Sequence, residues 1–299
     1  MGRKNDAERK SDTRMLKTGL TKFAAILATA VAGAAVLSAC QILSPEERAE
    51  ENLRNGESCV MCDLRYKSFT GMDLDGIDLR GAYLFNTNLE RTSMVGANLE
   101  SAVMILTDLE RADLTGANLA KANLSRAILF GATLRGADLT VANLVEANME
   151  AVELTHANLT TANLSNAILT DAFANNAEMP SAELKNANLV RANLRAANLQ
   201  GANLAGADLS NANLTLANLG SANLKGANLT GAVLSYANLR GADLSGAKLV
   251  EATITGANLK QAIFAKADLT GASISSVVKS GTDFCGAKMP SGLPGECKK

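Results

Sequence analysis

The residues best suited to chemistry are five cysteines and one histidine. Cys59 and Cys62 form a C-x-x-C motif, and Cys285 and Cys297 lie near the other end of the chain. A C-x-x-C pair is typical of a redox dithiol or of one half of a zinc site. Zinc is poorly supported, because His156 is the only histidine and the chain has no second C-x-x-C motif. We therefore expect no metal ligands and no cofactor site.

These cysteines flank a repeat with a period of five residues. Leucine occupies 34 of the 43 positions reached by counting every fifth residue from Leu64 to Ile274, without an insertion or a deletion. Two residues earlier, the chain has Ala at every repeat from Ala112 to Ala272 except at Val152. A period of five fits neither a helix of 3.6 residues per turn nor an alternating strand. Such a unit buries its apolar side chains only by stacking on its neighbours.

The five-residue unit predicts a coil with flat sides. In the stretch from Ala112 to Gly116, Ala112 and Leu114 share one face, because side chains alternate along an extended segment. Thr115 and Gly116 then form a corner, where Gly, Asn and Ser suit the turn. Asp113 faces outward, where a short polar side chain bonds to neighbouring backbone. Such carboxylates recur because of the repeat, so we expect no catalytic residues and no enzyme activity.

The unit A-(D/N)-L-x-x resembles the motif of the pentapeptide-repeat family, and the resemblance covers residues 64–274. It implies an all-β solenoid, a right-handed quadrilateral β-helix with four pentapeptides per coil. The repeats would make roughly eleven coils, about 50 Å long at ~4.8 Å per coil. We place the β-helix at residues 59–278 and a C-terminal cap at residues 279–299. Phe173-Ala174 and Met179-Pro180 depart from the motif, which predicts a local bulge or bend.

Residues 1–40 are typical of an export signal. Basic residues precede an apolar run from Phe23 to Leu37, which is long enough for a signal core and short for a membrane span. Leu37-Ser38-Ala39-Cys40 resembles a bacterial lipobox, in which Cys40 is lipidated and becomes the mature N-terminus. This predicts a lipoprotein anchored in the bacterial cell envelope, facing the periplasm or in the outer membrane. The alternative is an uncleaved signal anchor.

Residues 41–58 predict a polar tether with a short helix. Ser44 is a suitable N-cap, Pro45 suits the first helical position, and Glu47 lies three residues after the cap. Gly56 is placed to end the helix. The segment is too charged to form core, so we expect it to cover the first coil or to space that coil from the lipid.

The four cysteines that follow Cys40 are expected to be structural. In an exported protein they form two local disulfides, Cys59–Cys62 and Cys285–Cys297, each closing a short loop at one end of the coil. A stacked solenoid exposes unpaired backbone at both ends, so caps are expected there. Some pentapeptide-repeat proteins have similar C-x-x-C-D-L openings and Phe-Cys endings, which favours caps. A redox pair remains the alternative.

Stacking should place residues twenty apart above one another, and this predicts an apolar surface patch. Tyr83 is expected under Val103 and Phe85 under Ile105, with all four side chains pointing outward. Together with Phe173, they are our candidates for a partner surface, because exposed apolar clusters often mark contacts. The alternative is that the N-terminal tether folds over them.

Three classes of function remain: a membrane-tethered scaffold that binds a protein partner, a DNA-mimicking gyrase-binding protein like some pentapeptide-repeat proteins, and a thiol-redox protein. From Leu64 to Ile274 there are 16 basic and 19 acidic residues, a net charge of −3. DNA carries one charge per ~1.7 Å, or about 30 over the expected length, so a duplex mimic is disfavoured. Export would also separate the protein from gyrase. We therefore prefer the scaffold and expect no nucleic-acid partner.

Overall fold

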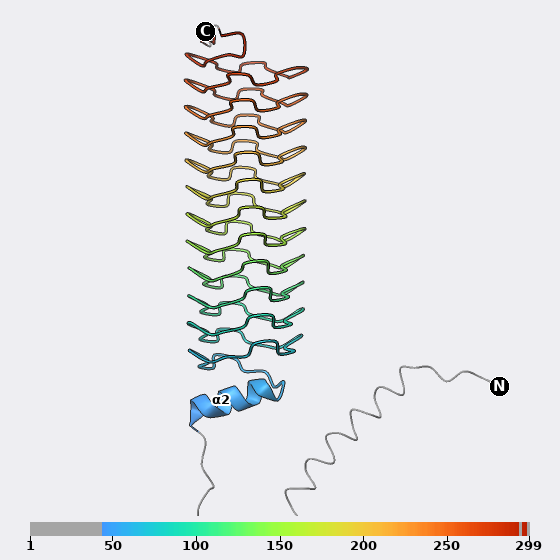
Figure 1. Cartoon of the computed structure of the whole chain (residues 1–299), viewed down its shortest axis with the longest axis vertical. Coiled ribbons are helices and arrows are strands. Elements are labelled where there is room, and N and C mark those ends of the chain that lie inside the picture. The colour runs from blue at the N-terminus through green and yellow to red at the C-terminus, as the bar shows by residue number, and fades with distance from the viewer. Residues whose placement is uncertain (1–43, 293–294, 298–299) are drawn as a thin grey trace, which may run out of the picture. The chain divides into compact units, whose positions relative to one another are not determined.

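The computed structural model describes residues 44–292 and 295–297. The chain divides into two compact units, and the described residues from Pro45 onward belong to the second, Pro45–Lys299. It contains one helix, α2 (Pro45–Arg54), followed by a coil that rises in regular steps toward the C-terminus (Figure 1). Within the described ranges, no helix is long and apolar enough to cross a membrane. The predicted signal segment lies outside them.

Successive coils are joined by backbone hydrogen bonds and by parallel β-bridges. The Leu114 amide nitrogen donates to the Thr133 carbonyl oxygen of the next coil at 2.7 Å, and Asp113 forms a parallel bridge with Thr133. Bridges between residues twenty apart continue in unbroken series from residue 63 to residue 288. The predicted stacking is therefore present, and it extends past the boundary expected at residue 278.

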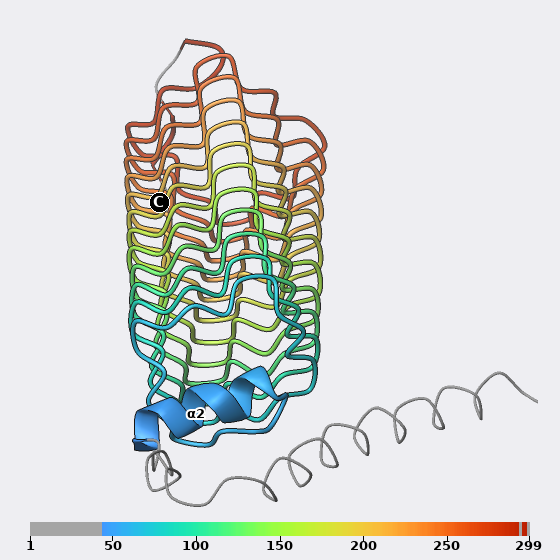
Figure 2. The ribbon, with the colours of Figure 1, turned by 60° about the horizontal axis from the view of Figure 1, so that its bottom comes forward.

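The sides of the coil are too short to form strands. Each side contributes a single bridge residue, such as Asp113, flanked by Ala112 and Leu114. Both flanking side chains point into the coil and are at most 1% exposed. Every fifth residue from Leu64 to Leu269 is buried in the same way. The core is therefore one continuous column of mostly Leu and Ala side chains, enclosed by the backbone (Figure 2).

The corners are β-turns whose third residue has a positive φ. Ala117 N–H donates to the Leu114 carbonyl oxygen at 3.0 Å, and Gly116 between them has a φ of 65°. Type II turns require positive φ at this position, and glycine adopts it without a steric penalty. Many corners carry a side chain there instead, including the β-branched Val141 at 62° and Thr161 at 56°. The backbone hydrogen bonds between coils therefore impose a positive φ at the corner even where the residue type disfavours it.

Helix α2 covers the first coil, which was one of the two roles expected for the tether. Leu53 is completely buried, and the Arg54 guanidinium carbon lies 5.3 Å from the centroid of the Phe69 ring. Lys67 of the first coil pairs with Glu50 of the helix at 2.8 Å. Hydrogen bonds from Lys67 and Arg54 hold the pKa of Glu50 below its usual value. The helix thus shields the apolar column at its N-terminal end (Figure 2).

The bulge predicted at Phe173-Ala174 and Met179-Pro180 was wrong, because parallel bridges continue through this stretch. Pro180 occupies the first corner position, where proline's fixed φ suits a β-turn. One coil earlier, Thr160 donates its backbone N–H from this position to the side chain of Asn158 at 3.1 Å, and not to another coil. Proline therefore removes no bond between coils.

Replacing Val141 by Asn should stabilise the protein. A left-handed φ costs an L-residue about 1–2 kcal/mol, and Asn tolerates it far better than a β-branched side chain. We expect Val141→Asn to raise the free energy of unfolding by about 1 kcal/mol in chemical denaturation. Val145→Asn is the matched control, because Val145 lies at the next corner without a positive φ. Equal effects of the two changes would contradict this account of the corners.

Candidate functional site

One side of the coil carries a polar bridge residue at nearly every level. We call this side the amide face. Its polar bridge residues are Asp78, Asn98, Asn118, Asp138, Asn158, Glu178, Asn198, Asn218, Asn238 and Asn258. Because these side chains stack at the spacing of the coils, many neighbours bind one another, as Asn118 binds Asn98 and Asn218 binds Asn198.

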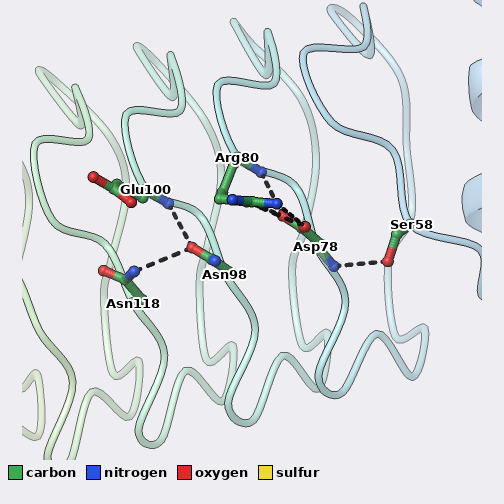
Figure 3. A network of polar contacts seen from close by, with 6 residues as sticks. All are labelled: Ser58, Asp78, Arg80, Asn98, Glu100 and Asn118. Carbon is green, nitrogen blue, oxygen red and sulfur yellow. Dashed lines mark hydrogen bonds and ion pairs between the residues drawn. The ribbon is translucent and has the colours of Figure 1, made fainter.

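In the first coils the amide face is a network of hydrogen bonds with one ion pair (Figure 3). Asn118 Nδ2 donates to Asn98 Oδ1 at 3.1 Å, and the Glu100 backbone N–H donates to the same oxygen at 3.2 Å. Arg80 turns back onto Asp78, with Nη2 at 2.8 Å from Oδ2 and Nε at 2.9 Å from Oδ1. The hydrogen bonds from Arg80 hold the pKa of Asp78 below its usual value. Arg80 is thus neutralised within its own coil.

Further along, the amide face forms a continuous ladder. Asn198 donates to Glu178 at 2.7 Å, and Asn218 donates to Asn198 at 3.1 Å. Asn238 donates to Asn218 at 2.8 Å, and Asn258 donates to Asn238 at 3.2 Å. Each of the three middle amides therefore donates to one neighbour and accepts from the other, which fixes the orientation of all of them.

Beside this ladder the surface has a polar hollow of about 410 Å³. Gly220 is one of its lining residues and is buried, while Gln200 and Arg240 carry side chains at the same corner position of the neighbouring coils. A Cβ on Gly220 would lie 3.2 Å from Asn218 Oδ1 and 3.3 Å from Asn238 Nδ2. Two ladder amides therefore pack against Gly220 at the wall of the hollow.

Sequence analysis missed Gly220 and Arg240, although two departures from the repeat mark them. Glycine is expected at the second corner position, where φ is positive, but Gly220 stands at the first and has no positive φ. Asn238 also stands two residues before Arg240, where Asp78 precedes Arg80. Comparing residues twenty apart would have exposed both differences.

The predicted apolar patch is present, but its members are unequally exposed. Tyr83 is 45% exposed and forms a bridge with Val103, whereas Val103, Phe85 and Ile105 are half-buried. Tyr66, which the sequence did not single out, is 68% exposed, and its ring meets Phe85 edge-on with 5.5 Å between ring centroids. We call these five residues the Tyr83 patch.

Phe173 does not belong to the Tyr83 patch. Bridges connect Tyr83 through the intervening coils to Asn163 on the same side. Phe173 follows Asn163 by ten residues, which is two five-residue sides, so it lies on the opposite side of the coil. Its ring is 48% exposed there. The structure therefore separates Phe173 from the other four candidate partner residues.

The cysteines close both ends of the coil. Disulfides join Cys59 to Cys62 at the N-terminal end of the coil and Cys285 to Cys297 at its C-terminal end. At the C-terminal end, the Phe284 ring stacks on Phe264 with 5.1 Å between centroids. Cys40, the predicted lipidation site, lies outside the described residues.

His156 lies at an exposed corner with a φ of 60°. Across residues 44–292 and 295–297, no group of three or more His, Cys, Asp or Glu side chains is placed to hold a metal ion. The polar groups that do converge are neutral amides and Arg240, which suit binding by hydrogen bonds and charge.

The chain belongs to the pentapeptide-repeat family. The family model described as Pentapeptide repeats matches it in eight copies, at residues 62–100, 107–144, 134–171, 142–179, 157–195, 177–215, 212–249 and 250–289. The fold known for this family is the right-handed quadrilateral β-helix, and the twenty-residue coil described above is consistent with it.

Several solved pentapeptide-repeat structures are similar to this chain. HetL, involved in heterocyst differentiation regulation in the cyanobacterium Nostoc sp. strain PCC 7120, is 31% identical, with 82% of this chain and 97% of HetL covered and a TM-score of 0.36. Rfr23 from the cyanobacterium Cyanothece 51142 is 28% identical, with 40% and 92% covered and a TM-score of 0.27. QnrB1, a plasmid-mediated fluoroquinolone resistance protein, is 17% identical, with 73% and 91% covered and a TM-score of 0.33. No curated protein sequence matches the chain.

Mass spectrometry of non-reduced digests should find the links Cys59–Cys62 and Cys285–Cys297. The stacked coils between residue 63 and residue 283 separate the two pairs, so a bond between them is out of reach. Replacing Cys285 and Cys297 together by Ser should cost about 3 kcal/mol of stability on the loop-entropy model. The shorter Cys59–Cys62 loop should contribute less. A Cys62–Cys285 link within one chain would contradict the stacked fold.

Proposed function

We propose that the protein is a non-enzymatic scaffold that presents the Tyr83 patch to a protein partner. The observation that carries this proposal is the exposure of Tyr66 and Tyr83 beside half-buried apolar neighbours. Large exposed aromatic side chains anchor many protein interfaces, because they bury apolar area and keep a polar group for hydrogen bonding. Contiguous apolar surface on a soluble domain often marks a contact site.

The surroundings of the patch support this role. Tyr83 follows Asp63 in the bridge column, and Asp63 forms an ion pair with Arg65 at the adjoining corner. Apolar centres with polar rims are the usual anatomy of protein interfaces. The ladder of backbone hydrogen bonds fixes the patch before binding, which lowers the entropic cost of association.

Site-specific crosslinking in the native host tests the scaffold. A photoreactive phenylalanine analogue at Tyr83 should give one dominant protein adduct, because this side chain lies at the centre of the proposed interface. The matched control is the same analogue at Phe173, which is similarly exposed on the opposite side and should give no such adduct. Absence of an adduct at Tyr83, or the same adduct at both positions, would overturn the proposal.

We also propose that Cys40 carries a lipid that anchors the scaffold in a bacterial cell envelope. Support comes from the apolar run ending at Leu37 and from Leu37-Ser38-Ala39-Cys40, which resembles a lipobox. The partner would then be a protein of the same compartment. A lipid anchor leaves the coil on the aqueous side of the membrane, where the patch is accessible.

Replacing Cys40 by Ser should abolish labelling by a fatty-acid analogue and leave an unprocessed precursor. The reason is that lipid transfer requires a thiol at that position, and processing follows the transfer. Cys59→Ser is the matched control and should keep full labelling, since Cys59 belongs to the disulfide cap. Labelling that persists in the Cys40 variant would exclude the lipoprotein anchor.

A further inference from the structure

Arg240 occupies the same corner position as Arg80, eight coils further along, but it lacks the carboxylate that Arg80 binds. Asp78 stands two residues before Arg80 and binds its guanidinium group at 2.8 Å. The corresponding residue before Arg240 is Asn238, whose amide is engaged in the ladder. Among the residues that the structure describes, no carboxylate forms an ion pair with Arg240. Its guanidinium group is therefore an exposed cation beside the hollow.

The charge around Arg240 also favours an anion. Residues 64–183 contain 8 basic and 15 acidic residues, a net charge of −7, whereas residues 184–274 contain 8 basic and 4 acidic residues, a net charge of +4. The next carboxylate after Arg240 in the chain, Asp243, is bound by Lys225 at 3.1 Å. The hollow thus lies in the positive part of the coil, where the field attracts anionic ligands.

Gly220 lines the hollow at a position where the turn does not require glycine, because its φ is not positive. In other coils the same corner position holds Thr140, Thr160 and Gln200 without a break in the bridge series. Gly220 is buried, and a Cβ on it would lie 3.2 Å from Asn218 Oδ1 and 3.3 Å from Asn238 Nδ2, so a side chain there would shift these two amides. The hollow itself has a volume of about 410 Å³ and is open to solvent.

The groups around this space are polar. Gln200 and Gln261 contribute side-chain amides, and Ser221 contributes a hydroxyl group. Asn238 Nδ2 carries two hydrogens, of which the bond to Asn218 uses one. A ligand without hydrogen-bonding groups would leave these side chains desolvated and unpaired. The chemistry therefore selects a ligand rich in hydroxyl groups that carries one negative charge.

We propose that this hollow binds a sugar acid, meaning a saccharide unit with several hydroxyl groups and one carboxylate. The carboxylate binds the Arg240 guanidinium in the place that Asp78 takes at Arg80, with the bidentate geometry that this pair favours. The hydroxyl groups bind the amides of Gln200, Gln261 and Asn238. The site lies about seven coils from Tyr83 and does not depend on the proposed protein partner.

A ligand-observed NMR titration of the full chain, held in a sugar-free non-ionic detergent, tests the proposal with D-glucuronate. We expect saturable binding in the millimolar range, with D-glucose and acetate each at least tenfold weaker. Arg240→Gln should weaken glucuronate binding about tenfold or more, because it removes the charged partner of the carboxylate. Acetate binding as tightly as glucuronate would overturn the sugar-acid assignment.

Two further variants use the repeat to separate loss of the site from loss of the fold. Asn238→Asp supplies the internal carboxylate that Asp78 provides to Arg80, and Gly220→Thr fills the hollow with the residue found at Thr140 and Thr160. Both should stay folded, with a cooperative thermal melt, and lose glucuronate binding. Arg195→Gln removes an exposed cation away from the hollow and should leave binding unchanged. Unchanged glucuronate binding in Asn238→Asp or in Gly220→Thr would overturn the proposal.

Discussion

The backbone hydrogen bond between coils is the interaction on which the rest of this structure depends. The bond from Leu114 N–H to the Thr133 carbonyl oxygen is repeated at each level, and it sets a register of twenty residues. That register brings Asn198, Asn218 and Asn238 close enough to bind one another. It also holds corner residues such as Val141 at a positive φ that they would not adopt alone. Amides linked in a chain of hydrogen bonds polarise one another, so the surface ladder through Asn218 and Asn238 is stronger than isolated pairs would be.

Because the repeat makes the coils alike, functional sites can arise only where one coil differs from the next. The proposed sugar-acid site contains two such differences, a glycine in place of a side chain at residue 220 and an amide in place of a carboxylate at residue 238. The Tyr83 patch likewise replaces the Asn residues that follow in its column with aromatic and aliphatic side chains. Neither site disturbs the core, since Leu and Ala remain buried at every level between them. Each short segment thus turns its core side chains inward and its proposed binding side chains outward.

Periodicity alone predicted the parts of the structure that every coil shares. The buried position of Leu114 and the corner at Gly116 follow from this pattern. Helix α2, which precedes the coils, follows from its capping residues, and each of these features is decided within a few residues of chain. Side-chain contacts between corners, such as Tyr66 against Phe85, were missed because corner side chains have no fixed direction in the repeat. The absence of an ion-pair partner for Arg240 was missed because the partners of a charged side chain are its neighbours in space, which the sequence does not show. The predicted bulge at Pro180 was wrong because a motif mismatch was treated as a backbone defect.

Because each twenty-residue coil has four five-residue sides, the number of residues between two surface positions determines the angle between them around the axis of the coil. Insertion or loss of a whole coil moves the hollow along the axis and leaves it at the same angle to Tyr83. Insertion or loss of a single pentapeptide between Tyr83 and Gly220 would instead rotate everything after it by a quarter turn, with the buried Leu column intact. Duplication or deletion of repeats therefore changes the angle between two surface positions in fixed steps. The four sides of the coil allow four such angles between the Tyr83 patch and the hollow, and the buried core stays the same at each of them.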